Sequence, residues 1–140
     1  MNERPSSALP ASTSDHYASV VDRCVESAVT TLGEAQIGAL LLIGAPARGE
    51  ATVVDAPGGP YSLSDVDLVC LSRPGPKVPE LRSRLARWVT EMNGRLSGEC
   101  AGVDASVRTA PPESGITPRI ATCEMLRSPA VLWGDASLLD

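Results

Sequence analysis

Residues 40–50 read LLLIGAPARGE and residues 64–71 read SDVDLVCL, and these two stretches indicate the fold more clearly than the rest of the chain. The first is an apolar run that ends in a glycine and a turn of small residues, which is typical of a buried strand and a tight turn. The second is an apolar run that opens with two aspartates. Because side chains alternate along a strand, Asp65 and Asp67 are expected on one face and Val66 on the other.

Two further patterns around these stretches predict helices. Apolar residues recur at helical spacing from residue 17 to residue 32, after a cap at Ser14 or Asp15 and before Gly33. They recur again from residue 81 to residue 96, where Pro79 suits the first helical position. Shorter helices are expected at 46–51 and 120–126. The long helices would each present one apolar face to a core.

Strand patterns complete the prediction. We expect strands at 37–43, 65–71, 102–107 and 131–133, and a turn or hairpin within 52–63, which contains Pro-Gly-Gly-Pro. A helix between the second and third of these strands allows a crossover that lays both in one sheet. The sequence therefore predicts a single α/β (α+β) domain, a small mixed β-sheet with helices packed on it.

Length and composition set limits on function. A chain of 140 residues suits one domain, with residues 1–13 as a flexible N-terminal tail and residues 14–140 as the folded part. The net charge of -5 argues against a surface for nucleic acid. Four widely spaced cysteines favour buried, reduced thiols, with disulfides in a secreted protein as the alternative. We find no signal peptide and no membrane span, so we expect a cytoplasmic protein.

Three aspartates on neighbouring strands suggest a metal site. Asp104 lies inside the strand expected at 102–107, where it shares a face with Ser106, and follows Asp65 and Asp67 after one helix. Two carboxylates can bridge a pair of divalent ions about 4 Å apart, and a third can complete the shell of one ion. Asp65, Asp67 and Asp104 are therefore the candidate catalytic and metal-binding residues, with two Mg²⁺ ions as cofactors.

In this order of features the chain resembles the nucleotidyltransferase superfamily of DNA polymerase beta type, in particular its small bacterial members and the aminoglycoside nucleotidyltransferases. The resemblance covers residues 37–107, and the tail at 130–135 is similar to a late segment of such domains. It implies Mg²⁺-dependent transfer of a nucleoside monophosphate from a nucleoside triphosphate, expected to be ATP, to a hydroxyl of a small molecule or protein, with release of pyrophosphate. The matching positions are Gly44, Arg48, Gly49, Glu50, Ser64, Asp65, Asp67 and Asp104.

The nucleotide-binding residues implied by this pattern are Gly44, Ala45, Arg48 and Ser64. Their backbone N–H groups, positive charge and hydroxyl would contact phosphate oxygens. The family usually has serine where this chain has Ala45, and losing a hydrogen bond to a charged group costs about 1.5–3 kcal/mol. The spacer from Gly44 to Asp65 is also longer than in the smallest members. Two alternatives follow: a weak or inactive nucleotide-binding or partner-binding module of the same fold, and the N-terminal domain of a longer transferase.

Overall fold

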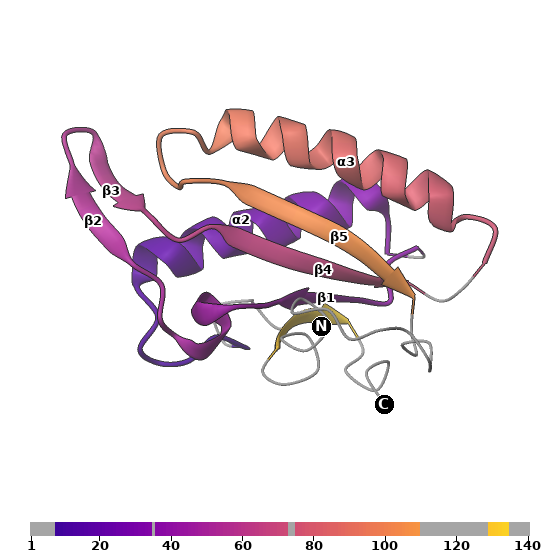
Figure 1. Ribbon diagram of the computed structural model, residues 1–140, viewed down its shortest axis with the longest axis horizontal. Coiled ribbons are helices and arrows are strands. Elements are labelled where there is room, and N and C mark those ends of the chain that lie inside the picture. Colours follow the sequence, from indigo (N-terminus) through magenta and orange to yellow (C-terminus); the bar gives the residue numbers. More distant parts are fainter. Residues whose placement is uncertain (1–7, 35, 73–74, 110–128, 135–140) are drawn as a thin grey trace.

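The computed structural model describes residues 8–34, 36–72, 75–109 and 129–134. Within these ranges two long helices lie on the same side of a mixed sheet, and a hairpin projects beyond one end of it (Figure 1). The elements in chain order are α2 (Asp15–Leu32), β1 (Ala39–Leu42), the 3-10 helix η1 (Ala45–Arg48), β2 (Val53–Ala56), β3 (Gly59–Ser62), β4 (Val66–Ser72), α3 (Val78–Arg95), β5 (Val103–Thr109) and β6 (Ala130–Gly134).

The sheet has the strand order β5-β4-β1-β6 in the described residues. β1 runs antiparallel to both β4 and β6, whereas β4 and β5 are parallel. A parallel pair needs a crossover connection, and α3 supplies it. The hairpin of β2 and β3 forms a separate small sheet, and its last residue, Ser62, also bridges to Cys100 in front of β5. The starts of β4 and β5 therefore lie side by side near the hairpin.

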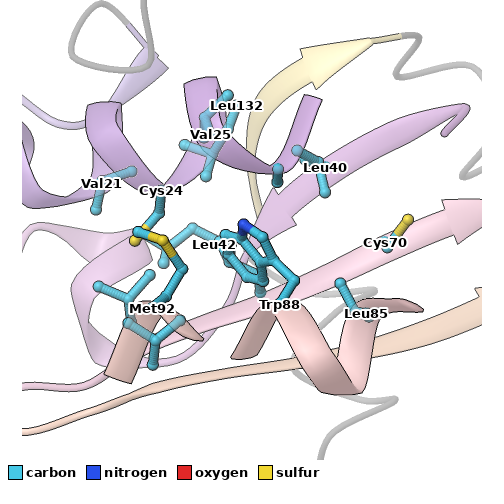
Figure 2. Close-up of a cluster of buried hydrophobic side chains, with 14 of the residues drawn as sticks. Val21, Cys24, Val25, Leu40, Leu42, Cys70, Leu85, Trp88, Met92 and Leu132 are labelled. Atoms are coloured by element: carbon cyan, nitrogen blue, oxygen red, sulfur yellow. The ribbon is translucent and has the colours of Figure 1, made fainter. Parts of the chain in front are cut away.

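The main core lies between the helices and one face of the sheet. Leu85, Trp88 and Met92 of α3 lie in one buried cluster with Val21 of α2 and Leu42 of β1 (Figure 2). Their exposed fractions lie between 0% and 3%, so these side chains leave water almost completely on folding. Burial of such large apolar groups contributes roughly 1.5–3 kcal/mol each, which makes this contact the main reason for the layered arrangement.

A second apolar cluster lies on the opposite face of the central strands. It contains Ala39, Leu41 and Ile43 of the β1 segment with Val69 and Leu71 of β4. These residues alternate with those that face the helices, as the pleat of a strand requires. Because β1 and the second half of β4 are buried on both faces, their sequences are almost continuously apolar.

The predicted fold class is confirmed: the structure is α+β, with helices packed on a small mixed sheet. The predicted helix at 46–51 is instead the single 3-10 turn of η1, and the strand expected at 37–43 is shorter. The helix expected at 120–126 lies outside the described residues. Residues 8–13, assigned by sequence to the tail, include Leu9, which is 8% exposed and belongs to the core. The boundary at residue 13 stays a prediction.

Cys24, Cys70 and Cys100 are buried free thiols, as the sequence predicted, whereas Cys123 lies outside the described residues. Burial raises the pKa of the Cys24 and Cys70 thiols to about 12, so both stay protonated and inert near neutral pH. Neither α2 nor α3 combines the length and the apolar character that crossing a lipid bilayer demands, and no other described helix does.

Candidate functional site

The acidic residues occur where β4 and β5 begin. The Val66 N–H donates to the carbonyl oxygen of Gly102 at 2.9 Å, which opens the parallel ladder between these strands. One residue further, Asp67 is the register partner of Asp104. Neighbouring strands are about 4.8 Å apart, so the Cα atoms of these two aspartates are direct cross-strand neighbours.

Asp67 and Asp104 also share a face of the sheet. Val66 and Leu68 on β4, and Val103 on β5, belong to the core on the helix side. Alternation along each strand then turns the two aspartates to the face away from the helices. Asp104 is exposed and Asp67 is half-buried, so one carboxylate is open to solvent and the other is partly shielded.

Asp65 precedes β4 and is exposed. A methyl group placed on Gly102 would lie 3.4 Å from the Asp65 Oδ1, which shows that this carboxylate lies beside the start of β5. The predicted juxtaposition of two neighbouring acid-bearing segments is therefore present in the structure, with Asp65 and Asp67 on one strand segment and Asp104 on the next.

The electrostatics of the three acids are unfavourable when all are ionised. Burial raises the pKa of the Asp67 carboxyl above its ordinary value, and the charges of Asp104 and Asp65 raise it further. Each of these causes disfavours the carboxylate form. A divalent cation between the acids would offset both the lost hydration and the mutual repulsion, so the donor set suits a hard metal ion such as Mg²⁺.

The small-residue turn lies at the same end of the sheet. The Ile43 N–H donates to the carbonyl oxygen of Asp67 at 3.1 Å, so the chain enters the turn beside the acid-bearing part of β4. Gly44 has a φ of 84°, a conformation that favours glycine, and Ala45 begins η1. Arg48 ends η1, and its Nη2 lies 3.6 Å from the Glu50 carboxylate, so its charge is partly neutralised.

Ser64 directly precedes Asp65 and has a structural role. Its Oγ accepts the N–H of Thr52 at 2.8 Å, and its carbonyl oxygen accepts the Ser62 hydroxyl at 2.8 Å. These bonds tie the approach to β4 to the hairpin. Because a hydroxyl that accepts one hydrogen bond can still donate its proton, the Ser64 hydroxyl can also act as a donor.

The side chains as they stand do not form a closed metal site. Within the described ranges, no three side chains of His, Cys, Asp or Glu are grouped closely enough to hold a single ion. The Asp104 Oδ1 instead accepts the N–H of Ala105 at 2.9 Å. Cavities of about 490 Å³ and 520 Å³ lie elsewhere, the first beside Ser72 at the far end of β4 and the second between Arg23 and Arg95.

Two polar residues that support the site were missed by the sequence analysis. Tyr17 of α2 contacts the backbone of Asp65, and Asn93 of α3 contacts the backbone of Val103. The helical spacing of apolar residues identified Tyr17 only as a core position of α2 and gave no sign of its hydrogen bond to Asp65. A signal existed for Asn93, since a partly buried amide in the last turn of an amphipathic helix requires a hydrogen-bond partner.

In comparisons with known proteins, no family model and no curated protein matches this chain.

Proposed function

We propose that this chain is a magnesium-dependent nucleotidyltransferase, which moves a nucleoside monophosphate from a nucleoside triphosphate to an acceptor hydroxyl. ATP is the expected donor, and the acceptor is a small molecule or a protein side chain. The buried free thiols and the net charge of -5 support a reducing, cytoplasmic setting and a substrate other than nucleic acid.

One observation carries the proposal. Asp67 and Asp104 are cross-strand partners on the same face of two parallel strands, and the turn at Gly44 joins them through the hydrogen bond from Ile43 to Asp67. Nucleotidyl transfer requires both halves of this arrangement, carboxylates for metal ions and backbone donors for phosphates. The location of the two aspartates and the Gly44 turn at one end of one sheet, despite their separation in sequence, supports the proposal.

Each residue has a role in this proposal. Asp65 and Asp67 would hold two Mg²⁺ ions, and Asp104 would complete the shell of the ion nearer the acceptor. When bound, the ions would stabilise the charge that develops on the triphosphate and make the acceptor hydroxyl more acidic. The acceptor oxygen bonds to the α-phosphorus, the bond from this phosphorus to the pyrophosphate oxygen breaks, and Asp104 takes the hydroxyl proton.

The nucleotide contacts belong to the turn. The backbone of Gly44 and Ala45, the Arg48 guanidinium and the Ser64 hydroxyl would hold the phosphates. The Asp104 Oδ1 accepts the Ala105 N–H, so a metal ion would bind the second carboxylate oxygen or a different rotamer of this side chain. Because Asp104 is exposed, such a rotamer change is fast.

Calorimetric titration with the Mg²⁺ complexes of ATP, GTP, CTP and UTP tests the proposal. We expect binding of at least one nucleotide by the native chain and loss of most of that affinity in Asp65→Asn and Asp67→Asn. Asp55→Asn is the matched control, because Asp55 is an exposed aspartate on the hairpin strand β2. Equal nucleotide affinity in the native chain and in the two site variants would refute the metal site.

A second function is favoured by Ala45 and by the hydrogen bond that engages Asp104. The chain would then bind a nucleotide or a partner protein without turnover. Incubation with triphosphates labelled with ³²P at the α-phosphate, together with candidate acceptors, separates the two functions. Incorporation of label that is lost in Asp104→Asn supports the transferase, whereas tight nucleotide binding without incorporation supports the binding module.

A further inference from the structure

Each of the two acid-bearing segments is held from the helix layer by one polar side chain. Tyr17 of α2 is 0% exposed, and its hydroxyl donates to the carbonyl oxygen of Asp65 at 2.9 Å. The bond reaches the backbone directly before β4. It therefore fixes the peptide unit that joins Asp65 to Val66, and with it the direction in which the two aspartates of this segment leave the chain.

Asn93 of α3 makes the corresponding contact with β5. Its Nδ2 donates to the carbonyl oxygen of Val103 at 2.8 Å, and its Oδ1 accepts the Val103 N–H at 2.9 Å. A second donation from Nδ2 to the carbonyl oxygen of Val89, at 2.9 Å, fixes the amide on its own helix. Two bonds to one residue restrict both the position and the rotation of the strand, and Asp104 is the next residue along it.

We infer that Tyr17 and Asn93 are positioning residues, which set the separation and orientation of the Asp65–Asp67 segment relative to Asp104. This inference rests on the proposed function. A metal site needs its ligands held to within about 0.5 Å of their binding geometry, and the groups that orient the ligands decide whether this is achieved. Here the oriented groups are two backbone segments instead of two side chains.

The charge state of Tyr17 suits this role over the whole physiological range. Burial raises the pKa of the phenol above its ordinary value, with smaller contributions from Cys24, Cys100, Asp65 and Asp67. The hydroxyl therefore keeps its proton and remains a donor. No charge is added beside three carboxylates that already repel one another.

A third polar contact provides a matched control. The Trp88 Nε1 donates to the Ser27 Oγ at 3.0 Å, which ties α3 to α2 without contacting either acid-bearing segment. Ser27→Ala therefore removes one partly buried hydrogen bond of the helix layer and leaves the aspartates as they are. Tyr17→Phe removes one bond and keeps the ring, and Asn93→Ala removes the bonds to β5.

Binding of Mn²⁺ in the presence of α,β-methylene analogues of the four nucleoside triphosphates, followed by the electron paramagnetic resonance signal of free Mn²⁺, tests the inference. We expect the native chain to bind Mn²⁺ and Asp67→Asn to lose this binding. Tyr17→Phe should raise the apparent Kd for Mn²⁺ by about three- to tenfold, the effect of one lost hydrogen bond. Asn93→Ala, which removes two bonds to Val103, should raise it by at least as much. Ser27→Ala should stay within about twofold of the native Kd, since its bond lies outside the site.

Urea unfolding of the same variants separates positioning from general loss of stability. If Tyr17→Phe and Ser27→Ala are equally stable and Tyr17→Phe still binds Mn²⁺ as tightly as the native chain, the inference is wrong. The proposed function would then still stand. Absence of Asp67-dependent Mn²⁺ binding in the native chain would overturn both. If Asn93→Ala does not fold, Tyr17→Phe decides alone, because phenylalanine preserves the buried ring.

Discussion

Asp67 is a partly buried acid with two other acids, Asp65 and Asp104, close enough to raise its pKa. Its register partner on the adjacent strand is Asp104, and Asp65 lies two residues before it on its own segment. Its pKa is raised by burial first and by the charges of Asp104 and Asp65 second. A group with such surroundings reduces stability when it is ionised. Proteins keep such groups mainly where a ligand or a reaction uses them.

The first prediction concerns the pH dependence of Asp67→Asn. An acid whose pKa is raised in the folded state binds more protons there than in the unfolded chain, so stability falls as pH rises through that interval. Without divalent metal, Asp67→Asn should be more stable than the native chain at pH 7. The difference should vanish below the ordinary pKa of an aspartate. Urea unfolding between pH 3 and pH 7 measures it.

The control for this prediction is Asp55→Asn, which removes the same kind of group at an exposed position of the hairpin, outside the three acids of the site. Addition of Mg²⁺ should stabilise the native chain and not Asp67→Asn. A native chain that gains stability relative to Asp67→Asn as pH rises from 4 to 7 without metal would contradict the account of this residue.

Ala45 gives a second prediction at the same scale. It begins η1 beside the candidate phosphate contacts, where the resembling family has serine. Ala45→Ser should tighten binding of the Mg²⁺-nucleotide by about tenfold, the lower end expected for a hydrogen bond to a charged group. Calorimetric titration checks this value. Ala51→Ser, in the loop that follows η1, is the control, and equal affinities in both variants would exclude Ala45 from the phosphate contacts.

Among the helices and strands, the sequence pattern predicted the features that depend on residues close together in the chain. The 3.6-residue spacing of apolar residues and Gly33 gave α2 almost to the residue, and alternation gave the faces of β4 and β5. The bonds made by Tyr17 and Asn93 were not predicted, because their partners lie 48 and 10 residues away in the chain. The antiparallel pairing of β6 with β1, across a bulge, is equally non-local.

The pairing of β6 with β1 gives a prediction for Gly134. This residue has a φ of 89°, and a methyl group on it would lie 2.2 Å from the Gly38 carbonyl oxygen. Gly134→Ala should therefore cost about 3 kcal/mol of unfolding free energy or more, from backbone strain and overpacking together. Gly59→Ala has a φ of 121° and no atom within 4 Å, so it should cost about 1–2 kcal/mol. If urea unfolding shows the same loss of stability in Gly134→Ala and Gly59→Ala, Gly134 does not lie close to the Gly38 carbonyl oxygen.

At the scale of the whole molecule, the helices pack on one face of the sheet, and the acids face away from them. Figure 1 shows both helices on one side of the sheet, and the register and alternation of β4 and β5 turn Asp67 and Asp104 to the other side. The helix layer therefore contacts these strands from the side opposite to the two carboxylates. From the amphipathic spacing, the sequence predicted helices packed on the sheet, but not that both would lie on the face opposite to Asp67 and Asp104. It could not predict the side-chain rotamers at the site, because these depend on contacts such as the one between Asp104 and Ala105.

The extent of the folded part gives the last prediction. The sequence placed its start at residue 14 because residues 1–13 show no periodicity, yet Leu9 is 8% exposed. Leu9→Ala should destabilise the chain by about 2 kcal/mol, as expected for a buried leucine. Leu63→Ala, at a leucine that is 55% exposed, should change stability by less than about 0.5 kcal/mol. If Leu9→Ala and Leu63→Ala both lose less than about 0.5 kcal/mol of stability, the folded part begins at residue 14, as the sequence predicted.

The central claim is that aspartates from two parallel strands hold metal ions together. A crystal structure with Mn²⁺ and a non-hydrolysable nucleoside triphosphate, using the anomalous signal of the metal, tests it most directly. If the aspartates hold the ions together, two peaks about 4 Å apart are expected, one of them within about 2.2 Å of oxygens from both Asp67 and Asp104. A bound nucleotide with no peak that touches both aspartates would contradict it.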